Sequence, residues 1–290
     1  HGQIVLPPGE YYAVASRGIE YELDYSEPFQ VQRNTHSRLK FAMFRTVDTT
    51  GWISADFHVH AAPSPDSGIS LPDRVTTFVA EGVEFMASSD HDVITNYQPI
   101  VEQLGLEPWI ATTPGTEVTT VEIGHFLGFP VRWDPLSDQG GALDWTNLEP
   151  QEIMDGLRDL GDPEISDPLV VVAHPRDGLS GYFDQYGFDM YSGTDSAVVE
   201  PSVFTELTND QISARQFTMD FDAMEVLNAK RFEVIRGPTT LEMETLSETP
   251  GSVSTFDLLS RPMSEQQRLA DGSAFISTDY PGPLDDWFTL

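Results

Sequence analysis

From Trp52 onward the sequence alternates between short apolar segments and segments with helical periodicity, and this alternation restricts the fold more than any other feature. The helical segments end at Gly82, Gly105 and Gly161, and Ser70 precedes the first of them as a helix cap. The apolar segments have strand character, and they lie at residues 53–59, 83–87, 109–111, 123–129, 169–173 and 223–227. Strands and helices in alternation predict an α/β fold with a parallel sheet, either open or closed into a barrel.

The first 50 residues follow a different pattern, since they contain strand-like alternation but no helical periodicity. Residues 11–14 and 19–23 predict a β-hairpin that turns at Gly18, and residues 39–43 predict a further strand. We therefore interpret residues 1–50 as a small β-sandwich-like domain that is incomplete.

The second predicted domain spans residues 51–290. Within it, the stretch at about 177–219 is polar, rich in Gly, Ser and Asp, and only weakly periodic. Such a stretch is typical of a long insertion, and we expect it to cover one end of the barrel.

The charge balance excludes several classes of partner. The chain has 47 acidic and 15 basic residues, a formal net charge of −32. Nucleic-acid binding needs a basic surface, and anionic membranes disfavour such a charge for the same reason. Abundant carboxylates suit a protein from a salty medium, where their mutual repulsion is screened. An ordinary acidic secreted protein is the alternative.

Several features that the sequence lacks exclude kinds of catalysis and a membrane-spanning segment. The chain contains no cysteine, which excludes disulfides, thiolate catalysis and cysteine-ligated zinc. It also lacks a Gly-x-Ser-x-Gly motif and a phosphate-binding glycine loop. No apolar run is long enough to span a membrane, and the first residues lack the features of a signal peptide.

Histidines concentrate at the ends of the predicted strands. Of the 7 histidines in the chain, five occupy such positions, namely His58, His60, His91, His125 and His174. Residues two apart in a strand project from the same face, so the first pair can reach one metal ion. A single histidine near a strand end is usually an ordinary polar residue, but five equivalent positions favour a metal site. His1 and His36 are interpreted as a chain terminus and a polar turn.

Three carboxylates accompany these histidines. Glu117 also follows a predicted strand, and a bridging carboxylate there favours two or three ions over one. Asp66 is either a turn residue or a ligand from a loop that folds back over the site. Asp90 is either a turn residue or a group that orients a liganding imidazole. Nitrogen and oxygen ligands without sulfur suit Zn, Mn or Fe.

These motifs resemble the PHP family, named for polymerase and histidinol phosphatase, over about residues 52–228. Residues 54–61 and 117–120 are most similar to the carbaryl-hydrolase-like branch, whose members often carry a β-domain in front. The motifs that carry the resemblance are Asp56-Phe57-His58-Val59-His60, Ser89-Asp90-His91, Gly115-Thr116-Glu117, Gly124-His125-Phe126 and Ala173-His174-Pro175-Arg176.

The resemblance implies a distorted (β/α)7 barrel with a centre of two or three divalent metal ions. The positions that match family ligands are His58, His60, Asp66, His91, Glu117, His125 and His174. Arg176 matches no ligand and is interpreted as a contact for a substrate oxygen, where it would stabilise an oxyanion. Residues 225–228 resemble a later strand and are interpreted as structural.

The sequence departs from the family at the closing Asp-x-His motif, because no histidine follows His174. Asp279 lies in a segment with only superficial similarity to that motif. We therefore expect a fragment whose last strand and final ligands lie beyond residue 290. The alternative is a natural chain that has lost these ligands.

Together these features predict a secreted or periplasmic metal-dependent hydrolase. A metal-activated water would attack a small phosphoester, ester or carbamate, which explains the absence of a nucleophile motif. The alternative is a catalytically silent extracellular structural or binding protein with a vestigial barrel. A nuclease of the same fold conflicts with the net charge.

Overall fold

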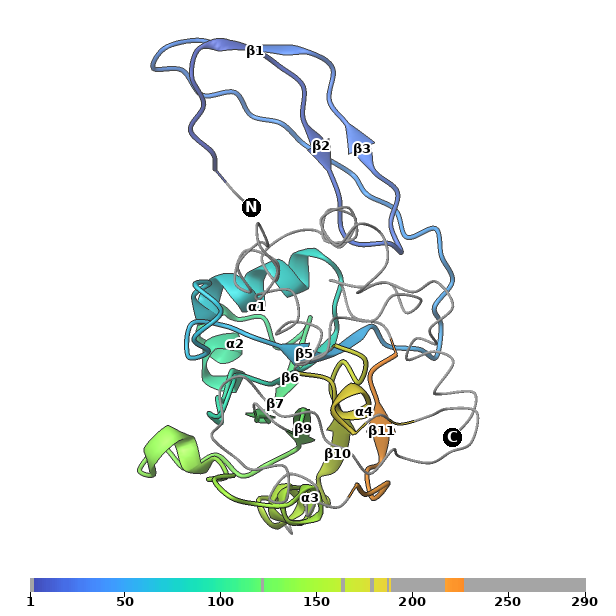
Figure 1. The fold of residues 1–290 in the computed structure, drawn as a ribbon. Coiled ribbons are helices and arrows are strands. Elements are labelled where there is room, and N and C mark those ends of the chain that lie inside the picture. Colours follow the sequence, from blue (N-terminus) through green and yellow to red (C-terminus); the bar gives the residue numbers. More distant parts are fainter. Residues whose placement is uncertain are drawn as a thin grey trace, which may run out of the picture. The chain divides into compact units, whose positions relative to one another are not determined.

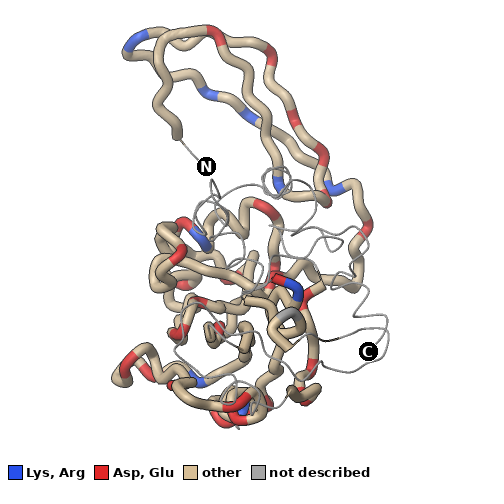
Figure 2. Tube along the Cα trace, in the orientation of Figure 1, with Lys and Arg blue, Asp and Glu red and all other residues tan. Residues whose placement is uncertain are grey.

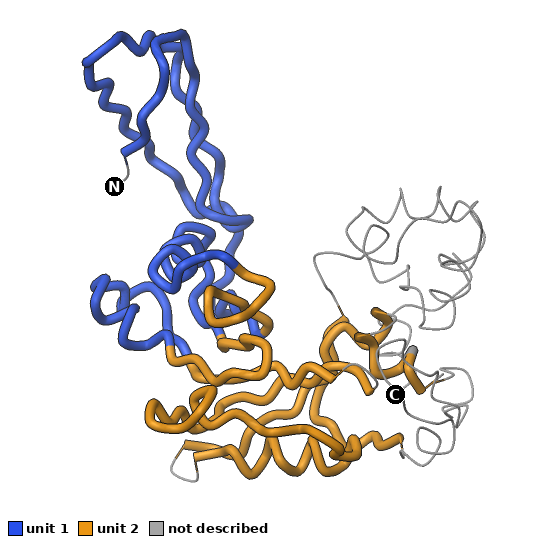
Figure 3. The backbone as a smooth tube through the Cα atoms, turned by 60° about the vertical axis from the view of Figure 1, so that its left-hand side comes forward, with its two compact units in different colours: residues 1–57, 68–86, 97–112 blue, residues 58–67, 87–96, 113–290 orange. Residues whose placement is uncertain are grey.

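The structure is a computed structural model that describes residues 3–120, 123–162, 165–177, 180–186, 188 and 217–226. The chain divides into two compact units (Figure 3). The first comprises residues 1–57, 68–86 and 97–112, and the second comprises residues 58–67, 87–96 and 113–290. This division differs from the boundary expected near residue 50, because two helical segments group with the N-terminal residues.

Four short strands lie in the N-terminal part of the first unit. β1 (Gly9–Tyr11) pairs with β4 (Phe29–Val31), and β2 (Val14–Ala15) pairs with β3 (Asp24–Tyr25), both antiparallel. β2 and β3 form a hairpin in the expected region, but the second strand predicted at residues 19–23 is wrong, because the chain pairs with β2 only from Asp24. The reason is that Gly18, with a φ of 73°, starts a turn that delays the return of the chain.

The strand predicted at residues 39–43 is wrong. The Ala42 N–H donates to the Asp24 carboxylate at 2.7 Å instead of to a neighbouring strand. Pairing in this region is limited to an isolated bridge between Tyr21 and Arg45.

Two helices of the first unit follow the sequence closely. In α1 (Leu71–Ala80), the Ser70 Oγ accepts the Asp73 N–H at 3.2 Å, and Gly82 follows the end of the helix at a φ of 80°. Helix α2 (Gln98–Leu104) ends at Gly105, which adopts the left-handed conformation. Both helices confirm the predicted capping and stop residues.

The strands form two larger sheets (Figure 1). One has the order β5-β6-β7 and contains β5 (Ala55–Val59), β6 (Phe85–Ser88) and β7 (Ala111–Thr113). The other has the order β11-β10-β9-β8 and contains β8 (Thr116–Thr119), β9 (His125–Phe129), β10 (Leu169–Val172) and β11 (Ala223–Met224).

The expectation of a purely parallel sheet is wrong for the second sheet. β9 runs antiparallel to both β8 and β10, whereas β10 and β11 are parallel. Residues 120–124 join β8 to β9, and so short a connection cannot hold the crossover that parallel pairing requires. The described residues contain no closed barrel, so the (β/α)7 barrel stays a prediction.

The core of the second unit forms where α3 (Pro150–Asp159) packs on β9 and β10. Ile153, Met154 and Leu157 of α3 are fully buried, as their spacing in the sequence predicts. A short helix, α4 (Tyr182–Gln185), adds a cluster of buried aromatic rings. The 3-10 segment η1 (Asp138–Gly141) is kinked, since Gln139 and Gly140 have φ values of 52° and 72°. This core holds β9 and β10, whose ends carry His125 and His174.

Several sequence predictions fall on other parts of the chain. Most of the predicted insertion at about 177–219, and Asp279, lie outside the described residues. In the part of the chain that the structure describes, no helix has the length and apolar character needed to cross a membrane.

Candidate metal centre

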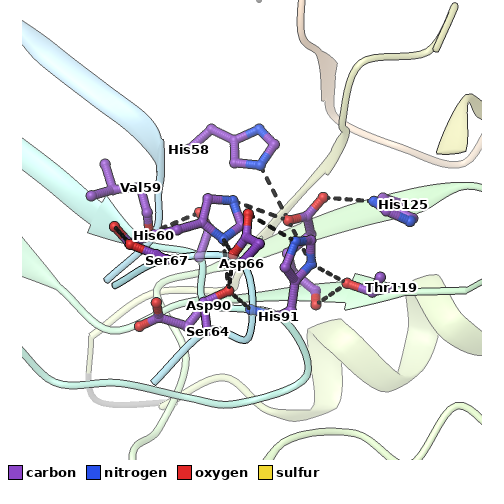
Figure 4. A network of polar contacts seen from close by, with 12 residues as sticks. His58, Val59, His60, Ser64, Asp66, Ser67, Asp90, His91, Thr119 and His125 are labelled. Atoms are coloured by element: carbon purple, nitrogen blue, oxygen red, sulfur yellow. Dashed lines mark hydrogen bonds and ion pairs between the residues drawn. The ribbon is translucent and has the colours of Figure 1, made fainter. Parts of the chain in front are cut away.

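Five histidines and Glu117 converge in the second unit. Figure 4 shows four of these histidines, His58, His60, His91 and His125. His58 and His60 lie two apart at the end of β5, so their side chains leave the same face of the strand. The other members lie in or next to four further strands. His91 and His174 follow β6 and β10, Glu117 lies in β8, and His125 begins β9. The structure thus brings together the residues that the sequence singled out.

Two glycines allow close backbone contacts next to the cluster. A Cβ on Gly115 would lie 2.3 Å from the carbonyl oxygen of Ser88, a distance that no side chain tolerates. Gly124 has a φ of 115°, and a Cβ there would lie 2.6 Å from the Tyr182 backbone. These two residues directly precede the segments that carry Glu117 and His125, and only glycine fits either position.

Glu117 is the centre of the cluster and is fully buried. Five imidazoles each place one ring nitrogen 2.9 to 3.2 Å from its carboxylate oxygens, and they belong to His58, His60, His91, His125 and His174. Three of these nitrogens face Oε2 and two face Oε1. Neighbouring rings in the cluster have centroids 4.6 to 5.7 Å apart.

Asp66 adds a second carboxylate to the rim of the cluster. Its oxygens lie 3.6 Å from Nδ1 of His60 and 3.6 Å from Nε2 of His91. The Ser64 hydroxyl donates to Asp66 at 2.7 Å and fixes the loop that carries it. The side chain of Asp66 is half exposed, which places it where the cluster meets solvent.

The donor atoms form three overlapping groups that could each hold a metal ion. In each group the ligand atoms lie within 4.8 Å of one another, and the groups are His58 with Glu117 and His174, His60 with Asp66 and His91, and His91 with Glu117 and His125. His91 and Glu117 each belong to two groups. All seven ligands expected from the sequence are members of at least one group.

Burial and hydrogen bonding shift the pKa values of the cluster residues in opposite directions. Burial raises the pKa of the Glu117 carboxyl, but its imidazole partners hold that pKa well below the usual range. Burial lowers the pKa of His58, whereas hydrogen bonds with Glu117 and Glu225 outweigh this effect and raise the pKa to about 10. Burial lowers the pKa of His125, which favours its neutral form.

The donor set fits divalent metal ions. A carboxylate offers about four lone-pair positions, fewer than the ring nitrogens directed at Glu117. One of these nitrogens, Nδ1 of His91, has a second partner, because it lies 2.5 Å from the Thr119 hydroxyl oxygen. A metal ion accepts lone pairs from imidazole nitrogen and carboxylate oxygen together, so these donor groups could hold one.

Asp90 is fully buried and supports the loop after β5. Its Oδ1 accepts the Ala61 N–H at 2.7 Å, and its backbone carbonyl accepts the Glu117 N–H at 3.2 Å. Asp90 thus anchors the segment next to His60 and the strand that carries Glu117. Its further role in orienting an imidazole stays a prediction.

Arg176 lies among buried aromatic rings, whereas its position two residues after His174 suggested a place beside the substrate. Its side chain is buried, its Nη2 donates to the Phe188 carbonyl at 2.9 Å, and its guanidinium lies 5.4 Å from the Phe183 ring centroid. It also lies over the ring of Phe188. These contacts give Arg176 a place in the aromatic core, and its contact with a substrate oxygen stays a prediction.

The sequence analysis missed one participant, Glu225, which it treated as structural. Its Oε1 lies 3.2 Å from Nδ1 of His58, and its Oε2 accepts the His174 N–H at 2.8 Å. Glu225 directly follows β11, at the same kind of strand end that carries the histidines. The sequence analysis placed Glu225 inside the strand predicted at residues 223–227, whereas β11 ends at Met224, so the position of Glu225 at a strand end was not recognised.

No protein-family model and no curated protein matches this chain. The resemblance of its motifs to the PHP family therefore stays a prediction.

Proposed function

We propose that this chain is a metal-dependent hydrolase that binds two or three divalent ions, Zn, Mn or Fe, and cleaves a small phosphoester, ester or carbamate. The convergence of five imidazoles on the buried carboxylate of Glu117 carries this proposal. So many donors around one buried carboxylate exceed what a structural histidine cluster needs. The three overlapping donor groups support a centre with more than one ion.

The residues of the cluster have distinct tasks in this proposal. His58 and His60 would hold metal from a rigid strand, and Glu117 would contribute both of its oxygens, which face different imidazoles. When bound, the ions supply a water of lowered pKa, about 7, and polarise the scissile P=O or C=O group. Asp66, at the solvent boundary, lies where an incoming substrate meets the centre.

The charge of the protein favours a small substrate. A net charge of −32 repels polyanions such as nucleic acids, so a small neutral or singly charged ester is the better match. Figure 2 shows acidic residues throughout the described chain, with few basic residues among them. The proposal also accounts for the lack of a serine or cysteine nucleophile motif.

The test combines metal analysis with hydrolysis. The chain is loaded with Zn or Mn and assayed on nitrophenyl phosphate, ester and carbamate substrates, and bound metal is measured by elemental analysis. The variant His58→Ala with His60→Ala should lose part of the bound metal and the hydrolysis with it, because the two histidines belong to two of the three donor groups. His36→Ala is the matched control, since His36 is exposed and is expected to leave both unchanged.

Two outcomes would contradict the proposal. Unchanged metal content in the double variant would show that the cluster is not the metal site. Metal binding without hydrolysis of any substrate would favour the alternative of a catalytically silent protein.

A further inference from the structure

We propose that Glu225 is a positioning residue of the metal centre, which turns the His58 ring and fixes the His174 backbone so that both histidines address the same ion. This inference rests on the metal centre of the proposed function. It adds a residue from β11 that belongs to none of the three donor groups.

The contacts of Glu225 connect it to two members of one donor group. One carboxylate oxygen lies 3.2 Å from Nδ1 of His58, and the other accepts the His174 N–H at 2.8 Å. At the opposite side of the His58 ring, Nε2 lies 3.2 Å from Glu117. The His58 ring thus lies between two carboxylates, with Glu117 at Nε2 and Glu225 at Nδ1.

The sheet determines where the Glu225 carboxylate lies. β11 runs parallel to β10, and the Glu225 N–H donates to the Val172 carbonyl at 2.9 Å. The side chain is largely buried, with 16% of its surface exposed. Register between the two strands therefore places this carboxylate beside the segment that leads into His174.

The contact with Nδ1 selects how His58 presents its ring. A carboxylate on Nδ1 favours the proton on that nitrogen, which leaves the Nε2 lone pair free for a metal ion. Partners of this kind behind a liganding histidine typically change metal affinity by about 10- to 100-fold when they are removed. His58 without Glu225 would be free to rotate or to protonate on the wrong nitrogen.

The contact with the His174 backbone acts on a strained residue. His174 has a φ of 26°, a conformation that residues other than glycine rarely adopt. The hydrogen bond from its N–H to Glu225 helps to hold this conformation, and with it the direction of the ring towards Glu117. One carboxylate therefore supports two ligands of the same ion.

Glutamine at position 225 separates this role from simple packing. Glu225→Gln keeps the shape of the side chain but replaces one oxygen by an NH₂ group, which cannot accept a hydrogen bond. Its remaining oxygen should keep the shorter bond to the His174 N–H, so that the NH₂ group faces Nδ1 of His58 and disfavours a proton on that nitrogen. Glu225→Asp keeps the charge but shortens the side chain by one methylene, so it cannot span both contacts.

The experiment measures zinc binding to the 290-residue chain after removal of metal with EDTA. Competition with a chromophoric chelator gives the affinity of each bound equivalent. We expect both variants to weaken the affinity for one of the bound zinc ions by about 10- to 100-fold and to leave the affinities for the other ions unchanged. The reason is that both ligands contacted by Glu225, His58 and His174, belong to one donor group. Asp222→Asn is the matched control, since Asp222 accepts the Val170 N–H at 2.8 Å from the same segment.

Nitrogen NMR of the zinc-loaded chain labelled in its histidines provides a second readout. Wild-type His58 should retain a proton on Nδ1 and coordinate through Nε2, with its signals assigned from His58→Gln. In Glu225→Gln this pattern should be lost, which a purely structural role would not produce.

Three results would overturn the inference. These are wild-type affinity for every equivalent in both Glu225 variants, unchanged His58 signals in Glu225→Gln, or an equal loss of zinc in Asp222→Asn. Failure of the proposed hydrolysis is a separate result, because a chain that binds zinc in a Glu225-dependent way but cleaves no substrate would still support the inference.

Discussion

His91 and Glu117 are connected through both their backbones and their side chains. Their residues form a parallel β-bridge, and the His91 Nδ1 lies 3.1 Å from Oε2 of Glu117. The backbone bonds extend this connection, because the Asp92 N–H donates to the Glu117 carbonyl at 2.9 Å. The geometry of the donor cluster is therefore determined by strand pairing, and a change in that pairing should reach the metal centre directly.

Gly115→Ala tests this connection without altering any candidate ligand. The new Cβ would meet the Ser88 carbonyl oxygen at 2.3 Å, so β8 and β6 must move apart. We expect the free energy of unfolding to fall by about 1–3 kcal/mol and zinc affinity to decrease. Urea unfolding and zinc competition measure the two effects.

Gly68→Ala is the control for this prediction, because no atom lies within 4 Å of the position of its Cβ. It should change the free energy of unfolding by less than about 0.5 kcal/mol. Wild-type zinc affinity in Gly115→Ala would show that the strand pairing does not set the geometry of the cluster.

Glu117→Gln should remove ions selectively rather than all at once. Glu117 belongs to two of the three donor groups, whereas the group of His60, Asp66 and His91 does not include it. The variant keeps the shape of the side chain but places an NH₂ group against imidazole nitrogens. We expect elemental analysis to find at most one ion per chain and hydrolysis to fall by more than about 100-fold, since the lost ions supply the activated water. Wild-type metal content would contradict the assignment of Glu117 as a bridging ligand.

Local features of the sequence were sufficient to predict two helices and the positions of the histidines in the cluster. Ser70, Gly82 and Gly105 define the ends of α1 and α2, because capping depends on neighbouring residues alone. The histidines were found because each follows the same rule of position relative to a strand. These predictions needed no knowledge of how distant segments pair.

The features that sequence analysis missed depend on tertiary pairing. The direction of β9 follows from its short connection to β8 and was hidden by the general α/β alternation. Glu225 reaches His58 only because β11 pairs with β10 in one register. Arg176 follows the candidate ligand His174 by two residues, yet contacts with Phe183 and Phe188 that sequence spacing does not encode place it in the core.

Arg176→Gln should act mainly on stability. The substitution removes a charged hydrogen bond to the Phe188 carbonyl and the contacts of the guanidinium with two aromatic rings. We expect the free energy of unfolding to fall by about 2–3 kcal/mol, with or without zinc, as measured by urea unfolding. Unchanged stability together with a large loss of hydrolysis would instead support the contact of Arg176 with a substrate oxygen.

Added salt should stabilise the protein. With 47 acidic and 15 basic residues, the folded chain concentrates negative charge that the unfolded chain can spread out. Salt shortens the range of this repulsion to about 10 Å at 0.1 M and less above it. The melting temperature should therefore rise with NaCl through the first few tenths molar, whereas equimolar sucrose should produce a smaller rise. A flat or falling response would contradict adaptation to a salty medium.

The metal-free chain should show a pH dependence that reports on His58. Hydrogen bonds with Glu117 and Glu225 raise the pKa of His58 to about 10 despite burial, which lowers it. A raised pKa in the folded state stabilises the protein fully below the unfolded pKa of about 6.5, and this contribution is lost as the pH rises towards 10. Comparison with His58→Gln isolates this contribution, because the other titrating groups are common to both chains.

In EDTA, the wild-type chain should therefore exceed His58→Gln in stability most clearly near pH 6, and the difference should shrink steadily up to pH 10. Urea unfolding at intervals across this range measures it. Zinc should reverse the trend, because the ligand nitrogen must lose its proton to bind, so stabilisation by zinc should grow with pH over the same interval. A constant difference between the two chains would show that His58 does not hold an additional proton between Glu117 and Glu225, and that the two carboxylates do not act on its ring as the contacts at 3.2 Å indicate.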